Sequence, residues 1–489
     1  MKTIIVGGGL GGLSAAVTLA KEGGEVQLFE KNQHFGGKMM PVDEDGYHFD
    51  FGPNTITMPH VFQNVMDQGG IPRSAQPDFH KIKTHTRNQW ENGEVFDLST
   101  DPSYMKQQLY KLDPKAEDLY GDFLQEVERL YQLSNRYFIN RTFLNFKDYL
   151  SGELALNTMK VRPFQSMNAF FSKYFTHPGI IQALNRYATY IGSNPYRCPA
   201  TFAMIAHLEL NDGVYYVRGG NTKIAEAFVK AARNQGAQLH SGHEVTRLLT
   251  TDDKITGVQL KNDEKISADQ VIINGDLLHT IPRLLEKEQR RSLNDDIIEN
   301  YDPSVSAFVI MAGLNTRMEN LHHHHVLFSS DYRKEFNELT QGKYSSDPTI
   351  YISTSSKTDR EVSPHGDNCF ILVNAPAVGG GGINKESYKK LIYEKLQRNQ
   401  INIEKYLSYE KVVAPQDIES KFYSFKGALY GPSSNTKLQA FRRPYNRSQD
   451  FSNLYFCGGS THPGGGSPMV VLSGQNIANY LVGKKTSYE

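Results

Sequence analysis

Residues 7–12 read Gly7-Gly8-Gly9-Leu10-Gly11-Gly12, which contains the pattern Gly-x-Gly-x-x-Gly. The apolar residues 3–6 before it predict a short buried strand, and the small residues 13–20 after it predict a helix. Glycines here permit a tight turn and a close approach of the backbone to a pyrophosphate, whose charge the helix N-terminus attracts. The stretch therefore predicts a dinucleotide-binding turn, with cofactor contacts from Gly7, Gly9, Leu10, Gly11 and Gly12.

An acidic residue ends the next predicted strand, residues 25–30. Glu30 follows the glycine turn at the distance at which a carboxylate accepts hydrogen bonds from the ribose hydroxyls of an adenosine. Lys31 comes directly after it and is included among the predicted cofactor contacts. The alternative is a glycine-rich turn with a solvated glutamate. Strand, turn, helix and acidic strand end together favour an adenine dinucleotide.

Size and composition narrow the class of protein. A chain of 489 residues has room for two or three folding units. The 53 basic and 53 acidic residues leave no net charge to attract nucleic acid, so we expect no nucleic-acid partner. The three cysteines, Cys198, Cys369 and Cys457, lie too far apart for a CxxC pair, which indicates a reducing cytoplasm and no zinc site. Nothing in the sequence indicates an oligomeric state.

The chain is expected to be cytoplasmic. No stretch reaches the roughly 18–20 apolar residues of a spanning helix, and the N-terminus leads straight into the glycine turn without the pattern of a signal peptide. Attachment to a membrane surface needs only a local apolar or basic patch. The predicted location is therefore the cytoplasm, with peripheral attachment to the inner face of the cell membrane.

The pattern of elements predicts an α/β fold with a discontinuous, Rossmann-like nucleotide-binding domain. Residues 1–86, 212–290 and 446–489 show strand, turn and helix patterns and are assigned to that domain. Residues 87–211 are rich in helix formers and aromatics, and residues 291–445 alternate as sheet strands do. These two stretches are predicted to form an inserted, mixed α+β substrate domain with a largely helical segment.

A second glycine pair follows the acidic strand end, at Gly36-Gly37-Lys38. Two glycines, which have no side chains, followed by a cation suit a second stretch of backbone that runs along the same dinucleotide. An ordinary turn with an exposed lysine is the alternative. With this segment the chain resembles the FAD-dependent amine oxidase and carotenoid desaturase superfamily. The resemblance implies FAD as the cofactor and places Gly37 and Lys38 near it.

Two longer segments narrow the resemblance. Residues 49–59 look like the Asp-x-Gly-Pro segment of bacterial phytoene and diapophytoene desaturases, and residues 458–468 are similar to the C-terminal flavin loop of that family. Gly219-Gly220 with the following helix and strand resembles the family's second FAD segment. The resemblance implies FAD contacts at Gly52, Pro53, Val245, Gly459, Gly465, Pro468 and Met469.

The resemblance leaves the branch of the family open. Gly459 and Gly465 stand where desaturases usually have alanine, which favours the C30 carotenoid oxygenases, whereas residues 136–142 and 326–333 look more like diapophytoene desaturases. We expect a FAD-dependent desaturase that dehydrogenates a C30 or C40 polyene such as diapophytoene by hydride transfer to the flavin. The alternatives are an oxygenase that converts a terminal methyl of diaponeurosporene or diapolycopene to an aldehyde, a flavin amine oxidase, and a non-catalytic FAD-binding protein.

Asp50 and His462 lie in the segments that the resemblance places near the flavin, so both are candidate proton acceptors or cation stabilisers. Hydrogen bonding that holds the loops in shape is the alternative role. The run of four histidines at residues 322–325 alternates sides on a strand and lacks acidic or cysteine partners, so no metal site is expected. The basic group at residues 442–447 suits either a solvated loop or lipid head groups. The expected partners are an apolar polyene and a membrane surface.

Overall fold

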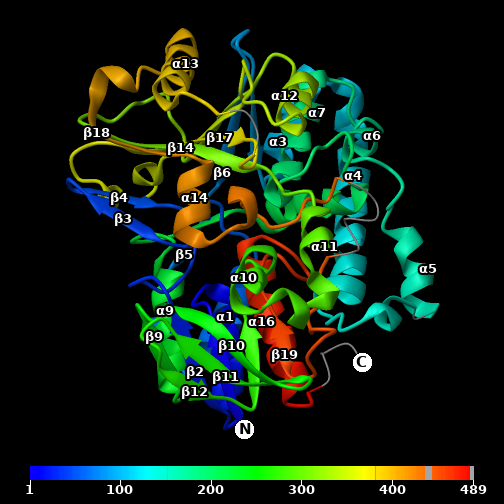
Figure 1. Ribbon diagram of the computed structural model, residues 1–489. Helices are drawn as coiled ribbons and strands as arrows, with labels where there is room; N and C mark the ends of the chain where they lie inside the picture. Colours follow the sequence, from blue (N-terminus) through cyan, green and yellow to red (C-terminus); the bar gives the residue numbers. More distant parts are fainter. Residues whose placement is uncertain (151, 380–381, 436–442, 485–489) are drawn as a thin grey trace.

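The computed structural model describes residues 1–150, 152–379, 382–435 and 443–484. One end of the molecule is built on a five-stranded parallel sheet, at the bottom of Figure 1. Its order is β19 (Leu454–Phe456), β13 (Gln270–Ile273), β1 (Lys2–Val6), β2 (Glu25–Glu30) and β9 (Gln238–Ser241). Strands from both ends and the middle of the chain thus form one sheet.

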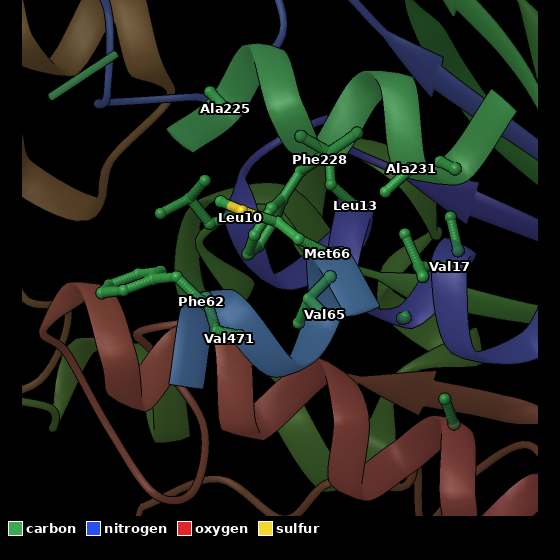
Figure 2. Packing of buried hydrophobic residues seen from close by; sticks show 14 of the residues in the cluster. Leu10, Leu13, Val17, Phe62, Val65, Met66, Ala225, Phe228, Ala231 and Val471 are labelled. Atoms are coloured by element: carbon green, nitrogen blue, oxygen red, sulfur yellow. The ribbon is translucent and has the colours of Figure 1, made fainter. Parts of the chain in front are cut away.

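Layers cover both faces of this sheet. Figure 2 shows the helical layer, in which Leu13, Phe62, Phe228 and Val471 meet in one buried cluster. Its helices are α1 (Leu10–Lys21), α2 (Pro59–Gln68), α9 (Lys223–Asn234) and α16 (Ser467–Leu481). The other face packs on an antiparallel sheet of β10 (Val245–Thr251), β11 (Lys254–Leu260) and β12 (Lys265–Ser267), together with α10 (Leu277–Leu284).

Helices α1 and α16 cross almost backbone to backbone. A Cβ atom on Gly474 would lie 2.0 Å from the carbonyl oxygen of Gly11, so only glycine fits at that point. The hydroxyl of Ser14 donates to the carbonyl of Val471 at 2.8 Å across the same crossing. The start of α1 is therefore held against residues 470–474 of α16.

A seven-stranded mixed sheet forms the upper body in Figure 1. Of the neighbouring strands in this sheet, β15 and β6 are parallel, and the other pairs are antiparallel. Its order is β18 (Leu407–Val413), β14 (Ser306–Leu314), β17 (Asn368–Ala375), β16 (Ile350–Ser353), β15 (His324–Leu327), β6 (Thr84–Gln89) and β7 (Val95–Ser99). Helix α13 (Lys385–Arg398) packs on it through Tyr388, Ile392 and Leu396.

A helical segment packs beside this sheet around a core that contains Phe123, Phe170, Phe171 and Tyr187. Its α-helices are α3 (Pro102–Leu112), α4 (Pro114–Ser134), α5 (Gly152–Lys160), α6 (Met167–Phe171), α7 (Pro178–Asn185) and α8 (Ile205–His207). The remaining strands and α-helices of the described residues are β3 (Pro41–Glu44), β4 (Tyr47–Asp50), β5 (Phe79–Lys81), β8 (Tyr215–Val217), α11 (Asp295–Glu299), α12 (Tyr332–Thr340) and α14 (Pro415–Phe422).

The predicted fold class is confirmed: a Rossmann-like α/β body is combined with a mixed α+β body that carries a helical segment. Two details differ from the sequence-based expectation. Helix α1 begins at Leu10, inside the stretch expected to be the turn, and β7 is a strand in a stretch expected to be mainly helical. Pairing with β6 makes residues 95–99 extended, because a sheet edge offers hydrogen bonds that local helix propensity cannot supply. The proposed domain boundaries remain a prediction.

Candidate functional site

The glycine turn between β1 and α1 is packed too closely for side chains. Gly7 has φ +103°, and a Cβ atom on Gly12 would lie 2.3 Å from the carbonyl oxygen of Gly7. Asn274, at the end of β13, donates to the same carbonyl at 3.1 Å and braces the turn. The backbone can thus approach a bound group without side chains in between.

Two helix N-termini meet at this turn. The N-cap residues of α1 and α16, Gly9 and Gly466, provide no side-chain cap, and neither helix has an acidic residue in its first turn. Backbone N–H groups at both starts are therefore uncapped, and the dipoles of both helices favour negative charge. Pro468 and Met469 lie in the first turn of α16. Leu10 and Gly11 lie in the first turn of α1.

Glu30 is buried beside the turn. One carboxylate oxygen accepts from the backbone N–H of Gly8 at 2.7 Å, and the other accepts from the backbone and side chain of Asn32, each at 2.9 Å. The carboxylate therefore lies at the carboxyl ends of the parallel strands, where dinucleotides bind in this class of fold. The backbone of His243 donates to the carbonyl of Glu30, which brings Val245 and β10 to the same edge.

Lys31 contacts the end of α14. Its ammonium donates to the carbonyl of Lys421 at 2.6 Å and lies 4.0 Å from the centre of the Tyr423 ring. Burial lowers the pKa of Lys31, against the opposing charges of Glu30 and Glu244. Its contacts hold the end of α14, and a cofactor contact of Lys31 stays a prediction.

The second glycine pair passes along the first. The backbone of Gly36 donates to the carbonyl of Gly8 at 2.8 Å, and a Cβ on Gly37 would lie 3.2 Å from the Cα of Gly9. Lys38 is held by the carbonyls of Ala428 at 3.1 Å and Leu429 at 2.6 Å. Burial lowers the pKa of Lys38 to about 8, and the charge of Asp276 opposes the shift.

Asp50 connects the segment around Gly52 and Pro53 to a later glycine pair. Its carboxylate accepts from the backbone N–H of Thr222 at 3.1 Å and contacts His48 at 3.4 Å. Burial lowers the pKa of His48, but its hydrogen bonds to Asp50 and Asp43 outweigh this effect and raise the pKa to about 9. These contacts favour a positioning role for Asp50, and catalysis by Asp50 stays a prediction.

The C-terminal loop is held by Arg443, which is buried, whereas the basic group of residues 442–447 was expected to be solvated or to contact lipid head groups. The guanidinium of Arg443 donates to the carbonyl oxygens of Gly459 at 2.8 Å, Pro432 at 3.1 Å and Tyr430 at 3.4 Å. Burial lowers the pKa of Arg443 to about 10. Its charge is held mainly by backbone dipoles, so no local motif could have revealed this role. Arg442, the neighbour predicted with it, lies outside the described residues.

His462 anchors the same loop to the helical segment. Its Nε2 lies 2.6 Å from the carbonyl oxygen of Phe138, and its ring meets Phe143 edge to face. Burial lowers the pKa of His462 to about 4, so the ring is neutral near pH 7 and Nε2 carries the proton that it donates to Phe138. A catalytic role for His462 stays a prediction, and its contacts favour anchoring.

The histidines of residues 322–325 have separate partners. His323 contacts Thr358 at 2.6 Å, His324 contacts Tyr351 at 2.8 Å, and His325 contacts Gln89 at 2.8 Å. In the part of the chain that the structure describes, no three histidine, cysteine or acidic side chains are placed to share a metal ion.

An apolar cavity of about 850 Å³ adjoins the C-terminal loop. Arg443, which holds Gly459, and Phe138, which holds His462, both line it. Aromatic and aliphatic residues make up most of the remaining wall, among them Phe146, Tyr149, Leu154, Met159, Phe164, Tyr301, Tyr445 and Phe456. Its volume suits a ligand of moderate size or part of a longer one.

Comparison with known proteins defines the class that this fold and site represent. Residues 10–482 match the flavin-containing amine oxidoreductases, and the chain belongs to this family. It is a FAD-dependent oxidoreductase, as the motifs predicted.

Among relatives of known activity, the chain is 32% identical to the 4,4'-diaponeurosporene oxygenase of Staphylococcus haemolyticus, over 98% of this chain and 97% of the relative. It is 33% identical to the 1-hydroxycarotenoid 3,4-desaturase of a Flavobacterium, over 98% and 99% of the two chains. A solved oxidoreductase of Methanosarcina mazei shares the fold with a TM-score of 0.60 at 18% identity, over 98% and 99% of the chains. Putrescine oxidase bound to putrescine shares it with a TM-score of 0.62 at 13% identity, over 99% and 100%.

The residues present suit FAD. The turn from Gly7 to Gly12 and the paired starts of α1 and α16 provide glycine backbone and uncapped N–H groups for a pyrophosphate. Glu30 is the carboxylate available to ribose hydroxyls at the strand ends. We propose that Gly37, Lys38, Gly52, Pro53, Val245, Gly459, Gly465 and the first turn of α16 complete the cofactor site.

The two glycines that replace alanine are not equivalent, and alanine substitutions separate them. A Cβ on Gly465 would lie 2.9 Å from the Cβ of Tyr430, whereas a Cβ on Gly459 would meet nothing closer than 3.5 Å. We expect Gly465→Ala to lower the free energy of unfolding by about 1–3 kcal/mol through overpacking and to reduce the FAD content of the purified protein. Gly459→Ala is the matched control. Equal flavin absorbance and melting temperatures for the two variants would contradict this difference.

A second prediction concerns pH. Because the pKa of His48 is raised in the folded protein, its stabilisation is complete below the unfolded value of 6.5 and is lost as the pH rises through about 9. We expect the melting temperature of the wild type to fall more steeply between pH 6.5 and about pH 9 than that of His48→Gln. The free energy of unfolding that the wild type loses over this range through His48 is about 3 kcal/mol at most. His365→Gln, at an exposed histidine, is the control. An equal change of the melting temperature with pH in the wild type and in His48→Gln would rule out the effect.

Proposed function

We propose that the protein is a carotenoid-modifying FAD enzyme that dehydrogenates an apolar C30 or C40 polyene. The observation that supports this best is the apolar cavity beside the C-terminal flavin loop, together with full-length relatives that act on carotenoids. When bound, FAD supplies the two-electron acceptor for a hydride from the substrate. The chain's own residues bind the cofactor, orient the polyene along an aromatic wall and exclude water.

Particular side chains set the geometry for this reaction. Arg443 fixes the carbonyl of Gly459 on one side of the loop, and His462 holds its Nε2 proton toward Phe138 on the other. Neither side chain is free to change partners without moving the loop. We therefore assign both to positioning of the site, and assign the hydride chemistry to the cofactor.

Oxidation of a terminal methyl group to an aldehyde is the second candidate function. It is favoured by Gly459 and Gly465 and by the relatives named as oxygenases of diaponeurosporene and diapolycopene. Both candidates begin with an extended polyene beside the flavin, so they share the site and differ in the product.

Product analysis tests the proposal. Purified holoenzyme is incubated with C30 and C40 polyene hydrocarbons, with oxygen and without, and the products are identified by mass. We expect loss of hydrogen pairs without gain of oxygen. Gain of oxygen in the aerobic arm alone would support the second candidate and overturn desaturation. Release of hydrogen peroxide with amines, and no conversion of polyenes, would contradict both.

A membrane surface is the proposed source of the insoluble substrate. Exposed apolar side chains lie at the cavity and on α5 beside it: Phe146 is 57% exposed, Leu156 73%, Met159 60% and Phe164 60%. Three of these also line the cavity, so its opening and the apolar surface are continuous. They lie on or beside α5, at the periphery of the molecule in Figure 1. Within the described residues, no helix is long and apolar enough to cross a bilayer.

Liposome flotation tests this surface. We expect the wild type to float with vesicles that contain anionic phospholipid, and the double variant Met159→Ser/Phe164→Ser to float several-fold less, because exposed apolar side chains lose their burial in lipid. Tyr110→Ser, at a residue 67% exposed on α3, is the matched control. Absence of the wild type from the vesicle fraction, or equal flotation of wild type and double variant, would contradict the proposal.

A further inference from the structure

The apolar cavity beside the C-terminal loop contains a cation that a hydrocarbon leaves unpaired. Arg447, from the basic group of residues 442–447, lines the cavity and is half-buried. Within the described residues its guanidinium forms no hydrogen bond and no ion pair. Arg443 in the same wall differs, because it donates to three carbonyl oxygens. Arg447 is therefore available to an acceptor group of a ligand.

Two phenol groups of the same cavity are also without partners. Tyr149 and Tyr301 line it, and neither hydroxyl has a hydrogen-bond partner in the part of the chain that the structure describes. Burial raises the pKa of both hydroxyls, so they stay protonated near pH 7 and can donate. A ligand without acceptor atoms would leave these donors unpaired in an apolar wall.

The charges of the wall favour an anion. Among the described residues that line the cavity, two are arginines and none is an aspartate or a glutamate. Asp148, which precedes Tyr149 in the chain, accepts from the backbone N–H groups of Leu144 and Asn145. An anionic group beside Arg447 therefore meets an unpaired cation and no carboxylate of the wall.

These groups together match a phospholipid. The aromatic and aliphatic wall suits an acyl chain, the forked donors of Arg447 suit a phosphate, and the phenols suit the ester carbonyls between the two.

The surface around the cavity indicates that the lipid comes from a bilayer. Phe146 and Met159 line the cavity and are exposed, and each is followed by an exposed lysine, Lys147 and Lys160. Apolar side chains that enter the acyl region, with cations at the level of the head groups, are typical of proteins that lie on a membrane surface. A free amphiphile in water would not require this exposed apolar surface.

We infer that the cavity binds a membrane phospholipid, with the phosphate on Arg447 and one acyl chain along the aromatic wall. The inference rests on the proposed function, which places a polyene in this cavity at a membrane surface, and adds the partner that the cavity holds there. An acyl chain and a polyene suit the same apolar wall. The lipid therefore fills the cavity between turnovers and keeps the wall out of water, and the entering polyene displaces its chain.

Lipid retention is measured without polyene and without turnover. Holoenzyme freed of lipid with detergent is incubated with mixed micelles that contain one probe, separated by gel filtration, and analysed for retained probe per bound flavin. The probes are dioleoylphosphatidylglycerol, dioleoylglycerol, which lacks the phosphate, and oleic acid, which lacks the ester carbonyls. We expect about one phosphatidylglycerol per flavin and at least about fivefold less of either other probe, because each leaves donors of the cavity unpaired.

Arg447→Gln is the test variant. We expect it to retain no more phosphatidylglycerol than dioleoylglycerol, because the cation for the phosphate is gone. Arg398→Gln, at an arginine 62% exposed on α13, is the matched control and should keep the wild-type retention. If Arg447→Gln loses flavin or cooperative melting, Arg447→Lys replaces it. That variant keeps the charge but lacks the forked donors, and its retention of phosphatidylglycerol should fall several-fold.

Thr158→Phe tests whether the acyl chain enters the cavity. Thr158 lines the cavity from α5, and a ring in its place occupies space that the chain needs. We expect this variant to retain several-fold less phosphatidylglycerol, whereas lipid adsorbed only to the outer surface would be retained unchanged.

Three results would overturn the inference: equal retention of phosphatidylglycerol and dioleoylglycerol by the wild type, equal retention of oleic acid, or unchanged retention in folded Arg447 and Thr158 variants. Failure of the enzyme to convert any polyene would refute the proposed function, while lipid retention would still decide the inference.

Discussion

The contact on which the rest of the structure depends is the crossing of α1 and α16 at Gly11 and Gly474. Because neither residue has a side chain, the helices approach until their backbones touch, and the start of α1 is held against residues 470–474 of α16. The loop of residues 458–466 leads into α16, so this crossing also fixes the loop against the glycine turn. Tyr430 and Arg443 then pack on the loop and connect it to the substrate side.

The sequence identified those parts of the site that are local in the chain. Gly7 to Gly12, Glu30 and Gly36-Gly37 each combine a backbone requirement with a fixed spacing, and the structure brings them together. The burial of Arg443 within the basic group of residues 442–447 escaped prediction, because it depends on carbonyl oxygens of Tyr430, Pro432 and Gly459 that only the fold brings around the guanidinium. The contacts of Lys31 could not be predicted either, since its partner Lys421 lies in the last turn of α14, far away in sequence.

Charge explains how the protein and its cofactor complement each other. Burial lowers the pKa of Lys38 and of Arg443, and Asp276 is the carboxylate whose charge opposes both shifts. Burial in turn raises the pKa of Asp276. The protein alone therefore holds two buried cations with limited compensation. The diphosphate of FAD is an anion, and we propose that its negative charge offsets part of this cationic charge.

The strand order of the parallel sheet has a consequence for the synthesis of the chain. Strand β13 has β1 on one side and β19 on the other, and β19 is formed by residues 454–456, whereas β1 begins at residue 2. As the ribosome extends the chain, the edge of β13 stays open until residues 454–456 have been made. The glycine turn likewise lacks its second helix until residue 467 has emerged. A nascent chain therefore becomes competent to hold the dinucleotide only after α16 has been made.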